Sequence, residues 1–253
     1  TGDQSVLVNG TTFNNITTVN AQANTNAEHL DSVSGSTTWD LLSTGFKANE
    51  ISFIDVETAD SGSDGTVNGS LIADSFTITG DQSVLVNGTT FSNITTVNAK
   101  TNTNTEHLDS VSGSATWGLS ENGFTANQIN FVDVETADSG SAGTVNGSLI
   151  ADSFEITGDQ SVLVNGTTFN NITTVNAQAN TNTEHLDSVS GSTTWGLSEN
   201  GFTANQINFI DVETADSGSE GTVNGSLIAD SFAITGDQSV LVNGTTFNNI
   251  TTV

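Results

Sequence analysis

Five residue types are missing from this chain of 253 residues: cysteine, methionine, proline, tyrosine and arginine. Without cysteine there is no disulfide, thiol nucleophile or cysteine-ligated metal. The only lysines are Lys47 and Lys100, which face 29 acidic residues and leave a net charge of -27. Basic patches are what bind phosphate backbones and anionic membrane surfaces. The composition therefore predicts no nucleic-acid binding and no docking to a membrane.

Long apolar runs are missing as well. A membrane-spanning helix needs about 18 or more consecutive apolar residues, and a signal peptide needs an apolar leader. Neither pattern occurs, so we expect no membrane insertion and no signal peptide in this sequence. Hydrophobic residues still make up 34% of the chain, which is enough to form a buried core rather than a disordered segment.

What the chain does contain is one unit of 78 residues written three and a quarter times. The same phrase, TGDQSVLVNGTTF, begins at Thr1, Thr79, Thr157 and Thr235. We therefore treat the chain as one continuous array and expect it to be a window on a longer one. Its repeats are residues 1–78, 79–156 and 157–234, with a partial fourth at 235–253.

Each unit contains a fainter internal repetition. Ser75–Ile78 is similar to Thr116–Leu119, and Val86–Ile94 is similar to Ala126–Val134. Both halves consist of short β-type runs separated by Gly, Asn, Asp and Ser, and neither has a sustained helical pattern of apolar residues. The sequence therefore predicts an all-β chain built from two related halves per unit.

Two all-β architectures fit this pattern. One is a parallel β-helix (β-solenoid) of about 20-residue coils, about four coils per 78-residue repeat. The alternative is a string of antiparallel β-sandwiches, one per repeat. The internal duplication favours the solenoid, because a Greek-key sandwich has no reason to repeat its own half.

One segment argues the other way. Val84–Phe91 has Asn-Gly at its centre, which is typical of a hairpin with a type I′ turn. The positions equivalent to Gly88 in the other half are Gln128 and Glu50, whose side chains do not suit the positive φ of that turn. If the halves share a backbone, we therefore expect no hairpin here.

The interior of the solenoid is expected to be filled by aromatic and β-branched side chains. The tryptophans align with phenylalanines in the half-repeat comparison, which favours a core position over an exposed sugar-stacking one. The predicted core residues are Phe91, Ile94, Val97, Trp117, Phe131, Val134 and Phe154.

Two groups of residues are candidates for metal binding. Asp133, Glu135 and Asp138 place carboxylates at near-alternate positions before a Gly/Ser turn, which suits an oxygen-ligated ion such as Ca²⁺. Outward-facing carboxylates that keep the chain soluble are the alternative. No other cofactor is expected.

The second group contains the histidines, which recur once per unit in Glu-His-Leu-Asp as His29, His107 and His185. Glu106, His107 and Asp109 form a weak candidate for a cation, and a solvated loop is the alternative. Stacked repeats keep the three histidines apart, so they cannot form one centre.

Paired carboxylates are also the catalytic groups of glycoside hydrolases, so we considered that activity. A hydrolase concentrates one acid and one base in a single cleft. Here almost the same residues are written three times, with no Arg or Tyr to bind a sugar. We therefore expect no enzymatic activity.

The segment Phe76–Ala99, with its degenerate partner Ile129–Gly140, resembles the repeats of very large bacterial surface exoproteins, such as the filamentous-haemagglutinin-like adhesins. The resemblance implies the shaft of a secreted adhesin, or an extracellular fibre of a biofilm matrix, located at the bacterial cell surface. It implies self-association into fibres and no catalytic residues, and leaves open whether a host, cell-surface or polysaccharide ligand is bound. The alternative function is that of tandem Ca²⁺-dependent β-sandwich adhesin repeats.

Overall fold

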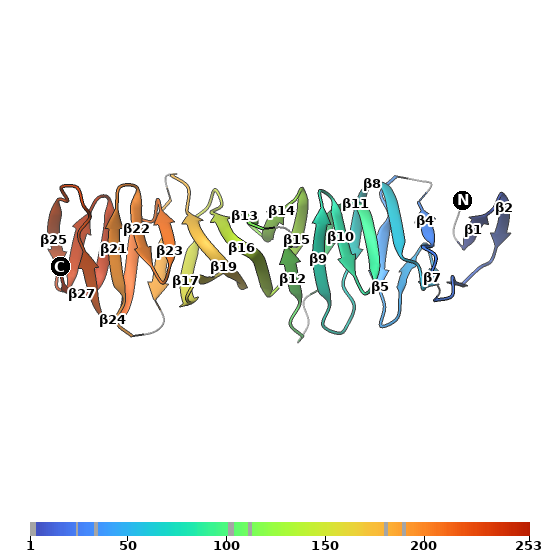
Figure 1. The fold of residues 1–253 in the computed structure, drawn as a ribbon, viewed down its shortest axis with the longest axis horizontal. Coiled ribbons are helices and arrows are strands. Elements are labelled where there is room, and N and C mark those ends of the chain that lie inside the picture. Colours follow the sequence, from blue (N-terminus) through green and yellow to red (C-terminus); the bar gives the residue numbers. More distant parts are fainter. Residues whose placement is uncertain are drawn as a thin grey trace. The chain divides into compact units, whose positions relative to one another are not determined.

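The fold is that of a β-solenoid, and every regular element in the described part of the chain is a strand (Figure 1). The computed structural model describes residues 4–23, 25–32, 35–100, 104–110, 113–179, 182–188 and 191–253. It divides into two compact units: unit 1 comprises residues 1–111 and 125–136, and unit 2 comprises residues 112–124 and 137–253.

Unit 1 holds the strands of the first repeat and half of the second. They are β1 (Ser5–Val8), β2 (Thr11–Asn14), β3 (Thr18–Asn20), β4 (His29–Asp31), β5 (Thr38–Leu41), β6 (Phe46–Ala48), β7 (Ile51–Ile54), β8 (Thr58–Asn68), β9 (Ser75–Gly80), β10 (Ser83–Val86), β11 (Thr89–Asn98), β12 (His107–Ser110) and β15 (Ile129–Val132).

Unit 2 holds β13 (Thr116–Ser120), β17 (Ser153–Gly158), β18 (Ser161–Val164), β19 (Thr167–Asn176), β20 (His185–Ser188), β21 (Thr194–Ser198), β22 (Gly201–Ala204), β23 (Ile207–Ile210), β24 (Thr214–Asn224), β25 (Phe232–Gly236), β26 (Ser239–Val242) and β27 (Thr245–Thr252). Two further strands contribute residues to both units: β14 (Gly123–Ala126) and β16 (Thr136–Asn146).

Apart from β1 and β2, which form a separate antiparallel hairpin, the strands of each unit form two hydrogen-bonded ladders. In unit 1 the tryptophan ladder, which contains Trp39, runs β3-β7-β6-β5-β8-β11-β15. The histidine ladder, which contains His29, runs β4-β8-β11-β10-β9-β12. The long strands β8 and β11 belong to both ladders and change register where they pass between them. Most neighbours in these two ladders are parallel, as a β-helix requires.

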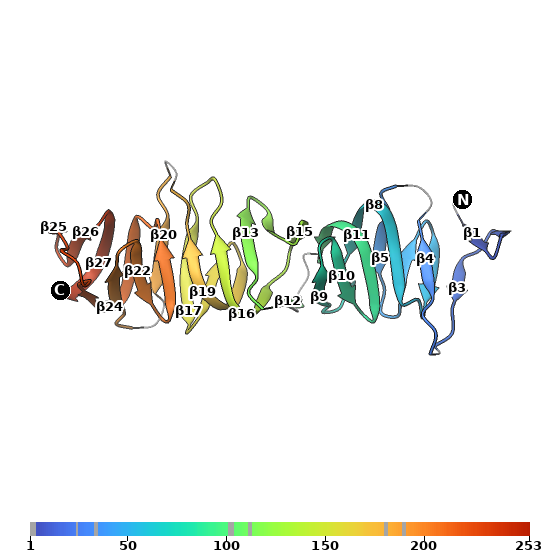
Figure 2. The ribbon, with the colours of Figure 1, turned by 45° about the horizontal axis from the view of Figure 1, so that its top comes forward.

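Unit 2 repeats this arrangement, and its strands β17 and β20 can be followed in Figure 2. Its tryptophan ladder runs β13-β16-β19-β23-β22-β21-β24-β27. Its histidine ladder runs β19-β18-β17-β20-β24-β27-β26-β25. The predicted solenoid is therefore confirmed, and the tandem β-sandwich is wrong.

The predicted coil length is wrong. Residues paired across parallel strands lie 28 to 34 positions apart in the chain, as for Trp39 with Val67 and Val97 with Phe131. The estimate of about 20 residues per coil assumed that a repeat contains only parallel turns. Each coil in fact crosses both ladders, and each repeat spends part of its length on antiparallel excursions.

Those excursions are hairpins, and our expectation that none would form was also wrong. Val86 pairs with Thr89 across Asn87 and Gly88, whose φ angles are 50° and 83°. A two-residue connection with positive φ at both positions is a type I′ turn.

The other half forms the same turn without glycine. Ala48 pairs with Ile51 across Asn49 and Glu50, whose φ angles are 49° and 66°. A left-handed residue other than glycine costs about 1–2 kcal/mol, which pairing on both sides of the hairpin offsets. The halves do share a backbone: the meanders β9-β10-β11 and β5-β6-β7 are equivalent, and both contain the turn.

The interior is filled by aromatic side chains, and the same ring contacts occur in each unit. The exposed fractions of the seven predicted core side chains are 0–3%. In unit 2 the rings of Trp195 and Phe202 lie 5.6 Å apart at 85°, and those of Phe202 and Phe247 lie 5.0 Å apart at 73°. The indole Nε1 of Trp195 donates to Ser217 Oγ at 2.8 Å. The tryptophans are core residues with their polar atom satisfied, rather than sugar-stacking platforms.

Candidate functional site

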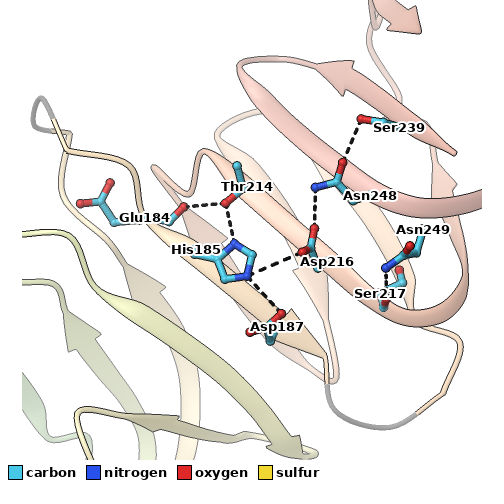
Figure 3. Close-up of polar contacts among 9 residues, drawn as sticks. All are labelled: Glu184, His185, Asp187, Thr214, Asp216, Ser217, Ser239, Asn248 and Asn249. Carbon is cyan, nitrogen blue, oxygen red and sulfur yellow. Dashed lines mark hydrogen bonds and ion pairs between the residues drawn. The ribbon is translucent and has the colours of Figure 1, made fainter. Parts of the chain in front are cut away.

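A group of polar residues in unit 2 surrounds His185 on the histidine ladder (Figure 3). His185 lies on β20, which pairs in parallel with β24, so the imidazole faces Thr214 and Asp216. Asp187 follows two residues later on the same strand and therefore points to the same side of the sheet. The side chains of His185, Asp187 and Asp216 are 35%, 52% and 30% exposed. The group is open to solvent, and a strand rather than a loop positions it.

The two imidazole nitrogens have different partners. Nδ1 lies 2.8 Å from Thr214 Oγ1. Nε2 lies 3.1 Å from Asp187 Oδ1 and 3.7 Å from Asp216 Oδ2. One ligand-type atom from each of the three residues lies within 4.8 Å of the others.

A relay of hydrogen bonds orients the Asp216 carboxylate. Ser239 Oγ donates to Asn248 Oδ1 at 2.9 Å, which fixes the direction of the amide. Asn248 Nδ2 then donates to Asp216 Oδ1 at 2.5 Å. Because Oδ1 is occupied in this way, Oδ2 is the oxygen left facing the imidazole (Figure 3).

Unit 1 contains a related arrangement around His29, in which Ser92 stands at the position of Asn248 and the neighbouring Asn93 contacts the carboxylate. The imidazole Nδ1 lies 2.7 Å from Thr58 Oγ1, and the imidazole Nε2 lies 2.8 Å from Asp31 Oδ1. Asp60 Oδ1 accepts from Asn93 Nδ2 at 2.6 Å. Hydrogen bonds, chiefly the one from Asn93, lower the pKa of Asp60, and His29 lowers it further when its imidazole is protonated. The His–Thr and His–Asp contacts therefore recur in unit 1, but His29, Asp31 and Asp60 do not come close enough together to form the three-atom group seen around His185.

The carboxylates predicted to bind Ca²⁺ have separate partners. Asp133 sits in a turn with φ 57°. Glu135 Oε2 accepts the backbone N–H of Glu106 at 2.8 Å, and Asp138 Oδ1 accepts from Asn170 Nδ2 at 2.6 Å. Of this set only Asp138, the equivalent of Asp216, occupies a position of the histidine group. The Ca²⁺ site predicted for these three carboxylates stays a prediction.

The position of Glu106 differs from what we expected. We expected Glu106, His107 and Asp109 to lie in a solvated loop, but Glu106 is 0% exposed. His107 and Asp109 lie on β12 and are joined by a 3.1 Å contact. Leu108, between them, is buried because alternate residues of a strand face opposite sides.

Sequence reasoning missed Thr214 and Asn248. The available signal was the spacing His-x-Asp on a β-type run, which places both side chains on one face. What could not be read was which strand lies beside β20, because that pairing joins residues 29 positions apart.

Two carboxylates of unit 1 have lowered pKa values, from which we expect the folding stability to depend on pH. The backbone N–H of Glu28 lowers the pKa of Glu57 below its usual 4.5. Hydrogen bonds from Asn93 and Gly62, with the charge of His29, lower the pKa of Asp60 below 3.8. Below its usual pKa the unfolded chain binds the proton more readily than the folded chain. These groups therefore contribute stability that is complete above about pH 5 and falls as the pH drops through their folded-state pKa values.

We accordingly expect the urea midpoint of unfolding to fall steadily between about pH 5 and pH 3. The Asp60→Asn variant should show a shallower fall over that range, because Asn cannot titrate. Urea unfolding at half-unit pH steps, followed by circular dichroism, measures both. An Asp60→Asn curve parallel to that of the unmodified chain would contradict the assignment.

A depression of about 540 Å³ lies beside the β1–β2 hairpin. Leu7, Leu30, Trp39 and Phe53 are among the residues that line it. In the later copies Val84 and Phe91, the equivalents of Val6 and Phe13, are buried against the preceding coil. Strands β1 and β2 form a separate two-stranded sheet, whereas their equivalents in the later copies belong to the ladders, and the depression lies beside that separate hairpin.

Comparisons with known proteins identify no relative. No protein-family model, curated protein or solved structure matched the chain. Within the described part of the chain, no helix is long and apolar enough to cross a membrane.

Proposed function

We propose that this chain is a structural segment of the shaft of a secreted bacterial surface adhesin or extracellular fibre, with no enzymatic activity. The observation that carries the proposal is that the same core is rebuilt in each repeat. In unit 2, Trp195 contacts Phe202 and Phe247 just as Trp39 contacts Phe46 and Phe91 in unit 1. A segment whose role is to extend a structure needs this uniformity, whereas a catalytic site needs one distinctive copy.

The pairing of strands supports an extending role. In unit 2, five ladder steps separate β13 from its equivalent β21, one repeat later. Neighbouring strands lie about 4.8 Å apart, so each repeat adds about 24 Å to the ladder. Because each coil contacts only its neighbours, repeats can be added without redesigning the core.

The proposal also includes association of the chain with copies of itself. Exposed apolar side chains support this part. Leu149 and Ile150 are 80% and 52% exposed, and their equivalents Leu227 and Ile228 are 107% and 59% exposed. Apolar loops repeated along an array provide contacts for a second copy, while the net charge of -27 opposes non-specific aggregation.

Two measurements test the proposal. Antibodies against the chain, applied to intact cells of the source bacterium, should label extracellular material, and label seen only after permeabilisation contradicts a surface role. Small-angle X-ray scattering of the chain should show an elongated particle that gains about 24 Å per added repeat. A gain of about 30 Å or more, as for separate domains, contradicts the continuous ladder.

A further inference from the structure

The hydrogen bonds around His185 are compatible with the tautomer that carries its hydrogen on Nδ1. Thr214 Oγ1 lies 3.2 Å from the backbone oxygen of Glu184, to which it can donate its single hydrogen. In that arrangement Thr214 Oγ1 accepts from His185 Nδ1 at 2.8 Å. In the neutral imidazole the lone pair then lies on Nε2.

That lone pair points at two carboxylate oxygens. Asp187 Oδ1 and Asp216 Oδ2 lie 3.1 and 3.7 Å from Nε2. Ionised carboxylates carry only lone pairs, so in that tautomer three electron-pair donors face one another. A proton or a metal cation between these atoms would satisfy all three.

The local charge favours a cation with more than one positive charge. Both lysines of the chain, Lys47 and Lys100, lie in unit 1, so no lysine or arginine of unit 2 can neutralise Asp187 and Asp216. Two carboxylates and a neutral imidazole balance a divalent ion.

The spacing also fits. Ligands about 2.1 Å from a tetrahedral metal lie about 3.4 Å from one another, which is close to the two measured separations. The partners outside the group are those expected around metal ligands: Thr214 holds the second imidazole nitrogen and Asn248 orients the Asp216 carboxylate.

We propose that His185 Nε2, Asp187 and Asp216 bind a divalent transition-metal cation of the Zn²⁺ type, with water completing its coordination. A nitrogen ligand and only two carboxylates suit Zn²⁺ better than Ca²⁺, which takes six to eight oxygen ligands. Because the group is open to solvent, the ion can enter and leave without unfolding.

The test uses the full chain with His29→Ala and His107→Ala, so that His185 is the only histidine. Calorimetric titration with Zn²⁺ near pH 7.5 should show one equivalent of tight binding, and equimolar Ca²⁺ should not compete. Adding Asp216→Asn should weaken Zn²⁺ binding by about tenfold or more, a loss typical of a damaged metal site. The matched control, Asp211→Asn, removes the same charge from a turn outside the group and should bind Zn²⁺ unchanged.

Two outcomes would overturn the proposal. One is equal Zn²⁺ affinity in the Asp216→Asn and Asp211→Asn variants, which would mean that the ion responds only to general charge. The second outcome comes from ¹⁵N spectra of the His185 imidazole, recorded with Asp216 unchanged. A proton-filled site would show both nitrogens protonated at pH 7.5 and no change on adding Zn²⁺. A metal site would show the Nε2 signal shifting alone.

Discussion

Replacing Phe91 with aspartate is expected to unfold the aromatic core of unit 1. Phe91 is 0% exposed, and its ring lies 5.8 Å from Trp39 and 5.1 Å from Phe46. Removing a large buried ring costs about 3–5 kcal/mol, and a buried, unpaired charge adds several kcal/mol more. The sum approaches the whole stability of an ordinary domain, about 5–15 kcal/mol.

Hydrogen exchange followed by mass spectrometry measures this effect locally. Peptides from β5 to β11 should lose protection in Phe91→Asp, while those from β24 to β27 keep theirs, because each coil depends mainly on its neighbours. Thr90→Asp is the control: it adds the same charge one residue earlier, on the outward face of the same strand. If Phe91→Asp exchanges like Thr90→Asp, the core assignment is wrong.

Replacing Gly201 with alanine should have the second largest effect. Gly201 has φ 140° and opens β22, which pairs with β23. A Cβ added there would lie 2.0 Å from the carbonyl oxygen of Phe209, where no real Cβ contact is found. The two strands must separate to admit the methyl group, so we expect a loss of more than about 4 kcal/mol, the range of severe single substitutions.

Gly166→Ala provides a close comparison in the same unit. Gly166 has φ 83°, and a Cβ there would have no neighbour within 4 Å. Only the left-handed backbone opposes this substitution, at a cost of about 1–2 kcal/mol. Urea unfolding of both variants separates the two contributions. Equal losses would show that the close approach of β22 to β23 does not determine the stability of this hairpin.

The amino-acid sequence by itself determined the repeat, the strand class and the core. Alternation along a strand is a local property, so Phe91, Trp117 and Phe131 could be assigned to the interior from their neighbours alone. Similarity between the two halves of a unit likewise predicted equivalent backbones. Their equivalence is visible in the paired meanders β5-β6-β7 and β9-β10-β11.

Only the tertiary structure decided which strands are neighbours. Those pairings in turn fix the hairpins, the coil length and the histidine group. Glu50 adopts a positive φ because pairing on both sides of its hairpin outweighs a local preference of about 1–2 kcal/mol. His185 meets Asp216 because β20 pairs with β24, 29 positions away. Such long-range pairings depend on the summed burial of the whole coil, which no short stretch of sequence contains.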